Sequence, residues 1–126
     1  MKRKIILFWG PILLVLFFAS SCGEKAKIAN LIVDGDFTRT MTIYNCPQYL
    51  GMVKNTGNNT AYNVMIDIQC FSDSGKKTLI DTAKGFPGNL GDIAPGTRAS
   101  FEAVAFNLNS WSQIQGEDYK ITWLER

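Results

Sequence analysis

The chain has 126 residues, with 13 basic and 11 acidic side chains and no histidine. Without histidine it lacks the commonest general base and the commonest metal ligand. This excludes Ser-His and Cys-His nucleophile pairs and any zinc site that uses imidazole. A phosphate-binding glycine loop is excluded too, because the glycines of residues 85–91 lack the Lys-Ser/Thr ending of that motif.

The N-terminus has the features of a secretory signal peptide. Residues 2–4 are basic, residues 5–19 form an apolar run, and small residues then lead into Cys22. A basic head, an apolar middle and a small-residue exit are typical of such peptides, whose head stays in the cytoplasm. The run is short of the roughly 20 residues of a bilayer crossing, and Pro11 interrupts it. A retained membrane span, or secretion without lipidation, are the alternatives.

The segment Ala19-Ser20-Ser21-Cys22 resembles the lipobox of bacterial lipoproteins, with Ala19 where the usual pattern has leucine. This resemblance implies a diacylglyceryl thioether on Cys22, cleavage before it, and acylation of the new amino group. Two or more acyl chains anchor a protein stably, because each buried methylene adds about 0.8 kcal/mol. We therefore expect a signal peptide over residues 1–21, a lipidated tether over 22–27 and an extracytoplasmic domain over 28–126.

Removal of residues 1–21 changes the charge of the chain. These residues hold three of the 13 basic side chains and none of the 11 acidic ones, so ten basic and 11 acidic side chains remain. A near-neutral domain has no electrostatic footprint for nucleic acid or for a charged membrane surface. The remaining length of about 100 residues is that of one domain.

Short β-rich runs separated by turn residues dominate the rest of the chain. The clearest run is residues 62–71, where Tyr62, Val64, Ile66, Ile68 and Cys70 fall on one face at period two. The expected strands are residues 28–33, 40–44, 49–54, 62–71, 78–83, 99–107 and 119–124. About seven short strands in this length predict an all-β fold, a two-sheet sandwich, with a small closed barrel as the alternative.

Two connections carry turn signals. In the loop 55–60, Asn55 and Gly57 tolerate the left-handed backbone that reverses a chain, and Asn or Thr side chains can bond back to loop amides. Residues 73–76 (Asp-Ser-Gly-Lys) predict a hairpin turn between the fourth and fifth strands.

Several stretches together resemble a known extracytoplasmic module. They are residues 51–58 (GMVKNTGN), 61–64 (AYNV), 71–76 (FSDSGK), Leu90, 93–96 (IAPG) and Phe101. In this order they are similar to the FxLYD-type domain and its relatives among bacterial immunoglobulin-like or fibronectin-like β-sandwiches. The resemblance implies a fold and a location outside the cytoplasm, and it implies no defined reaction, because such folds host many functions.

Acidic residues give no strong site. Asp34-Gly35-Asp36 lacks the further oxygen ligands of a calcium loop and is interpreted as a turn. Glu117 and Asp118 are adjacent just before the last expected strand, where neighbouring side chains tend to point apart, and they are interpreted as a solvated turn. With only Cys46 and Cys70 remaining, four-ligand zinc binding is excluded. We expect no metal, no cofactor and no catalytic residues.

Cys46 and Cys70 are a candidate disulfide, because an even number of cysteines in an oxidising compartment favours one. A hairpin centred on Asn58 would place them opposite each other. In a sandwich the two strands can instead belong to opposite sheets, with Cys70 as a core-facing thiol. Geometry decides between these arrangements.

Trp111, with Phe106 and Tyr119 nearby, is a candidate aromatic contact surface, with a core position as the alternative. The sequence thus predicts a lipid-anchored, non-catalytic binding or assembly module in the cell envelope, with a membrane and a protein as partners. A structural envelope component without a ligand, or an enzyme of unrecognised type, are the alternatives.

Overall fold

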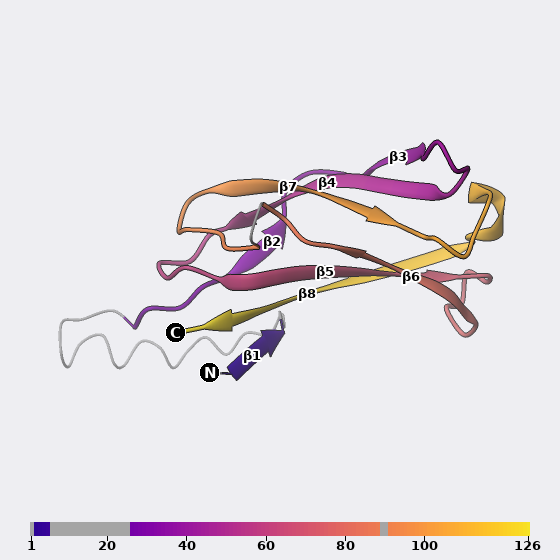
Figure 1. Cartoon of the computed structure of the whole chain (residues 1–126). Coiled ribbons are helices and arrows are strands. Elements are labelled where there is room, and N and C mark those ends of the chain that lie inside the picture. Colours follow the sequence, from indigo (N-terminus) through magenta and orange to yellow (C-terminus); the bar gives the residue numbers. More distant parts are fainter. Residues whose placement is uncertain (1, 6–25, 89–90) are drawn as a thin grey trace.

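The computed structural model describes residues 2–5, 26–88 and 91–126 (Figure 1). The expected lipid site Cys22, most of the expected signal peptide and tether, and Leu90 lie outside these residues. The strands are β1 (Lys2–Ile5), β2 (Leu31–Val33), β3 (Thr38–Met41), β4 (Pro47–Asn55), β5 (Tyr62–Phe71), β6 (Leu79–Gly85), β7 (Arg98–Val104) and β8 (Gly116–Glu125). The described segments contain one helical turn, η1 (Trp111–Gln113), and no helix with the length and apolar character of a membrane span.

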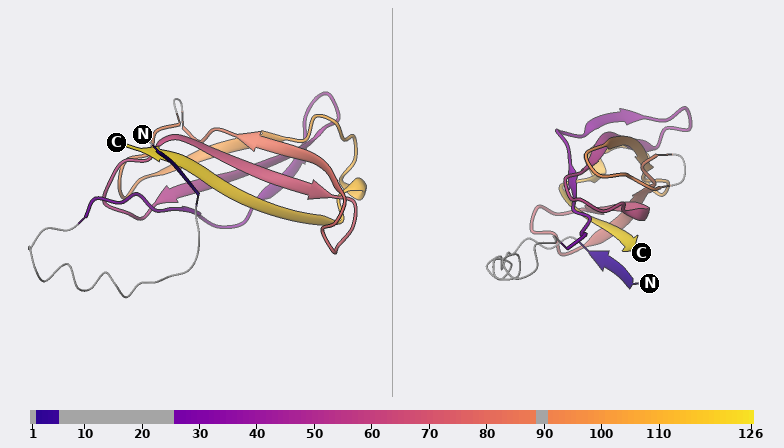
Figure 2. Two further views of the ribbon diagram at one scale, coloured as in Figure 1. Left: turned by 90° about the horizontal axis from the view of Figure 1, so that it is seen from below. Right: turned by 90° about the vertical axis from the view of Figure 1, so that its left-hand side faces the viewer.

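The strands are all antiparallel and follow the order β1-β8-β5-β6-β7-β4-β2, with β3 also paired to β4. β6 and β7 pair only at Lys84 and Val104, and the path folds over there. As a result β8, β5 and β6 face β7, β4 and the short strands β2 and β3 (Figures 1 and 2). No pairing between β2 and β8 closes the opposite side within the described residues. The expected single all-β sandwich is confirmed.

Between the two layers lies one apolar core, to which β5 contributes most. Val64, Ile66, Ile68 and Cys70 are fully buried, which confirms the period-two pattern. On the opposite face of β5, the carboxylate of Asp67 lies 3.4 Å from Nζ of Lys84 on β6. The other buried apolar residues of the core are Ala29, Leu31, Tyr49, Val53, Ala61, Ala83, Ile93, Phe101, Ala103, Ala105, Leu108, Ile121 and Trp123.

The strand expected over residues 40–44 is wrong in position. β3 ends at Met41, and residues 42–46 form a turn whose centre is the side chain of Thr42. Thr42 Oγ1 accepts hydrogen bonds from the amides of Tyr44 and Cys46, each at 3.2 Å. Asn45 has a φ of 62°, a conformation that asparagine tolerates better than most residues. These local bonds replace the strand pairing that the β-branched composition predicted.

The hairpin turn expected at residues 73–76 is confirmed. β5 and β6 pair in antiparallel register on either side of it. The Asp73 carboxylate accepts hydrogen bonds from the amides of Lys77 and Thr78. These bonds hold the pKa of Asp73 below its ordinary value.

The left-handed conformation expected at Asn55 and Gly57 is wrong, since neither residue has a positive φ. Gly57 is required for a different reason: a Cβ there would lie 2.1 Å from the carbonyl oxygen of Ile28. The expected bonding of a side chain to loop amides is confirmed, because Asn55 Oδ1 accepts from the Gly57 amide at 2.9 Å.

Asn55 is a buried polar residue that connects several segments. Its Nδ2 donates to the carbonyl oxygens of Asn59 at 2.7 Å and Ile93 at 3.0 Å. Its Oδ1 also accepts from the amide of Asn30, just before β2, at 3.2 Å. The side chain therefore holds the end of β4 against β2, the following loop and the segment before β7.

Replacing Asn55 with alanine should leave these backbone groups without partners. We expect Asn55→Ala to lower the free energy of unfolding by about 2–4 kcal/mol, since each buried unsatisfied group costs about 1–3 kcal/mol. Denaturant unfolding measures this difference. The matched control Asn109→Ala, at an exposed position, should change stability by less than about 0.5 kcal/mol. Equal effects of the two substitutions would contradict the structural role of Asn55.

Candidate functional site

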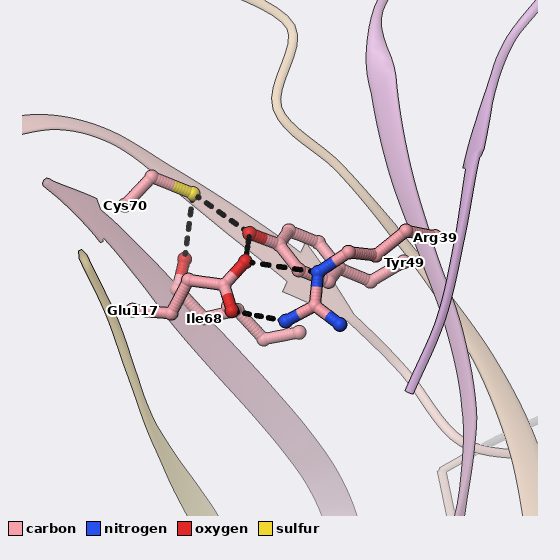
Figure 3. Close-up of polar contacts among 5 residues, drawn as sticks. All are labelled: Arg39, Tyr49, Ile68, Cys70 and Glu117. Carbon is pink, nitrogen blue, oxygen red and sulfur yellow. Dashed lines mark hydrogen bonds and ion pairs between the residues drawn. The ribbon is translucent and has the colours of Figure 1, made fainter. Parts of the chain in front are cut away.

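Four side chains from four different strands meet near one end of the sandwich (Figure 3). The hydroxyl group of Tyr49 on β4 donates to the carboxylate of Glu117 on β8. The guanidinium of Arg39 on β3 binds both oxygens of the same carboxylate. The thiol of Cys70 on β5 lies 3.6 Å from the Tyr49 hydroxyl oxygen and 3.9 Å from the carbonyl oxygen of Ile68.

Aromatic rings enclose this cluster. Trp111 meets Tyr49 edge to face, with 5.0 Å between ring centroids, and Phe37 meets Tyr49 in the same way at 5.8 Å. The guanidinium of Arg39 lies over the rings of Tyr49 and Trp111 at 5.7 and 5.9 Å. The cluster is therefore shielded by apolar surface while Arg39 stays half exposed.

Burial controls the protonation of the cluster. Burial, followed by the hydrogen bond to Glu117, raises the pKa of Tyr49 far above its ordinary value of 10.0. Burial also raises the pKa of the Cys70 thiol above 9.0, and the contact with Tyr49 only partly opposes this. The hydrogen bond to Glu117 raises the pKa of Arg39. At neutral pH the phenol and the thiol therefore keep their protons.

A protonated, fully buried thiol is a poor nucleophile, because the thiolate is the reactive form. The hydroxyl group of Tyr49 donates a hydrogen bond to Glu117 and keeps its proton, and the side chain is fully buried. The arrangement thus favours a structural role, in which a shared hydrogen-bond network joins β3, β4, β5 and β8.

Trp111 belongs to this packing and does not form an exposed aromatic surface. Its indole Nε1 donates to the carbonyl oxygen of Thr40 at 3.0 Å, and its ring packs against the core. Tyr119, half exposed, packs edge-on against Phe37 with 5.7 Å between centroids. Of the aromatic group expected from the sequence, Phe106 is the strongly exposed member, at 76%.

Cys46 and Cys70 are both free thiols. Cys70 lies on β5, whereas Cys46 lies in the turn before β4, in the facing layer, so the simple hairpin that would have placed them face to face does not form. The group that faces Cys70 across the core is the hydroxyl of Tyr49. Cys46 Sγ lies 3.8 Å from the carbonyl oxygens of both Tyr44 and Phe106.

The solvated turn expected at Glu117 and Asp118 is wrong, because both residues lie within β8, although their side chains point apart as expected. Glu117 points to the cluster, whereas its neighbour Asp118 points outward and pairs with Lys76 at 2.9 Å. Asp34 forms an ion pair with Arg98 at 3.2 Å. Across the described ranges, no three or more His, Cys, Asp or Glu side chains come together in a way that could hold a metal ion.

One exposed apolar surface was anticipated only in part, through Phe106. Ile43, Tyr44 and Phe106 are 88, 80 and 76% exposed, and we call them the tip surface. The contacts of Cys46 with the carbonyl groups of Tyr44 and Phe106 show that the two loops lie side by side. Asn45 and the proline at position 47 were the sequence signals for this turn, but the β-branched and aromatic residues beside them favoured a strand.

The tip surface is both rigid and uncharged. Two backbone hydrogen bonds, Thr42 N–H to Cys46 O at 2.9 Å and Asn45 N–H to Thr42 O at 3.0 Å, join the two bonds that Thr42 Oγ1 accepts. Residues 40–47 and 103–111 contain no charged side chain. The loop therefore presents large apolar side chains from a fixed backbone.

The stability of the folded state should depend on pH, because Tyr49 keeps its proton when the protein is folded. Because its pKa is raised on folding, the associated stability is complete below pH 10.0 and is lost as the pH rises from there toward the folded pKa. Cys70 acts with the same sign from pH 9.0. We expect Tyr49→Phe to cost about 1–3 kcal/mol at neutral pH and to weaken this alkaline loss. Urea unfolding at several pH values measures both, and Tyr44→Phe should match the unchanged protein at neutral pH.

The two thiols should differ in reactivity. Under native conditions we expect iodoacetamide to modify the partly exposed Cys46 and to leave the buried Cys70 unmodified until the protein unfolds. Mass spectrometry of peptides counts the modified sites. If neither residue reacts before reduction, a disulfide is present and the free-thiol arrangement is wrong.

Comparison with known proteins gives no match at the level of family models, curated proteins or solved structures. The candidate site is therefore defined by this chain's own residues. These are the shielded cluster of Arg39, Tyr49, Cys70 and Glu117, and the tip surface beside it.

Proposed function

We propose that the protein is a lipid-anchored, non-catalytic binding module that presents its tip surface to a partner protein in the bacterial cell envelope. The observation that carries this proposal is the position of the tip surface. Residue 26, where the chain enters the fold, lies at one end of the sandwich, and the loops with Ile43, Tyr44 and Phe106 lie at the other (Figures 1 and 2).

The anchor part of the proposal is supported by the sequence before residue 26. The basic, apolar and small-residue segments in front of Cys22 have the arrangement of a secretory signal peptide, and residues 19–22 resemble a lipobox. A tether over residues 22–27 spans at most about 20 Å when extended. Strands of ten residues add about 33 Å between the tether and the opposite end. An upright domain therefore holds the tip surface well away from its own membrane.

The binding part is supported by the cost of exposing the tip surface. Each large apolar side chain left in water forgoes about 1.5–3 kcal/mol of burial. A loop fixed by four hydrogen bonds cannot fold these side chains inward. Rigid aromatic and aliphatic groups of this type are common at the centres of protein interfaces. The two loops carry no basic side chain, which favours an apolar partner surface over nucleic acid.

The protonation of the cluster supports a non-catalytic role. Tyr49 and Cys70 keep their protons at neutral pH, and Glu117 is engaged by Arg39 and Tyr49. The network holds η1 against Tyr49 and β3, which positions the two loops of the tip surface. No cofactor or metal is part of the proposal.

Two measurements on the full chain, produced in its own cells, test the two parts. Intact mass of the membrane-bound protein should show cleavage before Cys22 and added acyl chains. A photo-cross-linking amino acid at Tyr44 should give one discrete protein adduct in intact cells. The same amino acid at Phe86, which is 62% exposed outside the tip surface, is the matched control and should not give that adduct.

The outcomes separate the alternatives. A full-length or unacylated mass would exclude the lipid anchor and leave a retained span or simple secretion. A lipidated protein with no adduct specific to position 44 would favour a structural envelope component without a discrete ligand.

A further inference from the structure

The outer edge of β8 is a second feature that the tip surface does not explain. On its inner side β8 pairs with β5 from Gly116 to Leu124. On its outer side β1 pairs with Thr122–Glu125 in antiparallel register, and no other strand of the described residues pairs there (Figure 1). β8 is thus regular enough to form hydrogen bonds on both sides.

The occupant of this edge comes from the expected signal peptide. β1 is Lys2–Ile5, which forms the basic head and stays in the cytoplasm when a signal peptide directs export. An exported domain that begins at Cys22 has lost these residues. The outer side of β8 then becomes the edge of its sheet, with unpaired amide and carbonyl groups along the strand.

An edge of this kind normally carries protection, and β8 has charged side chains such as Lys120 but contains no proline. It is ten residues long, and its register with β5 is continuous from Met65 to Phe71 and shifts between Tyr62 and Met65, opposite Thr122–Leu124. Natural proteins usually shorten, bulge or cover such an edge, because it is a template for another strand. The edge of β8 is therefore suited to strand addition.

The pairing with β1 indicates which segment fits. Lys2 lies opposite Glu125 in the register, and Lys4 lies opposite Trp123. A basic residue opposite a carboxylate favours pairing across antiparallel strands.

We propose that, in the processed protein, the outer edge of β8 accepts an extended basic segment of a partner protein as an added strand. Main-chain hydrogen bonds hold such a segment, and its cationic residue beside Glu125 sets the register. The site rests on the removal of residues 1–21 in the proposed function. It lies along the side of the sandwich and is separate from the tip surface.

A synthetic peptide of the first six residues, MKRKII, is the probe for this edge. The processed protein is purified from membranes in detergent, and its mass first confirms that residues 1–21 are absent. Amide hydrogen exchange of the peptide fragments that cover β8 is then measured with and without millimolar MKRKII. We expect exchange over residues 122–125 to slow severalfold, with β4 and β7 unchanged.

The control probe has the same side chains with the amides of Arg3 and Lys4 both N-methylated. Neighbouring amides in a strand point to opposite sides, so this modification removes a main-chain donor whichever amide faces β8. It should abolish the slowing. The protein variant Glu125→Gln keeps an acceptor for the Ala29 amide, which Glu125 binds at 2.6 Å, and should weaken the effect of MKRKII.

Three results would overturn the proposal. One is no change in exchange at residues 122–125 with MKRKII on a protein whose cleavage is confirmed. Another is equal slowing by the methylated control. The last is protection of the edge that grows with protein concentration when no peptide is present, which would assign the edge to a second copy of the chain. A protein whose mass shows no cleavage contradicts the proposed function and is distinguished before the titration begins.

Discussion

The end of the sandwich that carries the tip surface depends on the hydrogen bond between Tyr49 and Glu117. It crosses from one sheet to the other, and Arg39 completes it on the same carboxylate. The rings of Phe37 and Trp111 pack on Tyr49, so the residues before β3 and the helical turn η1 are placed by one side chain. Because a buried hydroxyl needs a partner, the Tyr49–Glu117 bond fixes how the sheets align at this end.

The architecture was predictable where burial alternates along a strand. In β5 the apolar positions Val64, Ile66 and Ile68 sit at period two, and the structure buries all three. The position of Ile43 was not predictable in this way, since β-branched residues suit strands and here the hydroxyl of Thr42 ends the strand. Over a few residues, local side-chain hydrogen bonds can prevent the strand that the composition favours. A pattern of hydrophobic residues does not reveal such bonds.

The cluster around Tyr49 could not be predicted from the sequence, for a different reason. Tyr49 and Glu117 are far apart in the chain and become neighbours only because β4 and β8 lie in facing sheets. The same long-range geometry decides which group Cys70 contacts, since it places the thiol opposite the hydroxyl group of Tyr49. Trp111 is partly buried against the core, and its partner Thr40 could be identified only after β3 was placed.

In the turn at residues 42–46, the groups that fix the backbone are different from the side chains that are exposed. Its hydrogen bonds use the backbone and the Thr42 hydroxyl, and none of them involves the side chains of Ile43 or Tyr44. Substitutions at these two positions should therefore leave the backbone of the turn intact, as long as Thr42 and Asn45 are kept. Under the proposed binding function, such substitutions would change the surface offered to a partner without changing the fold that presents it.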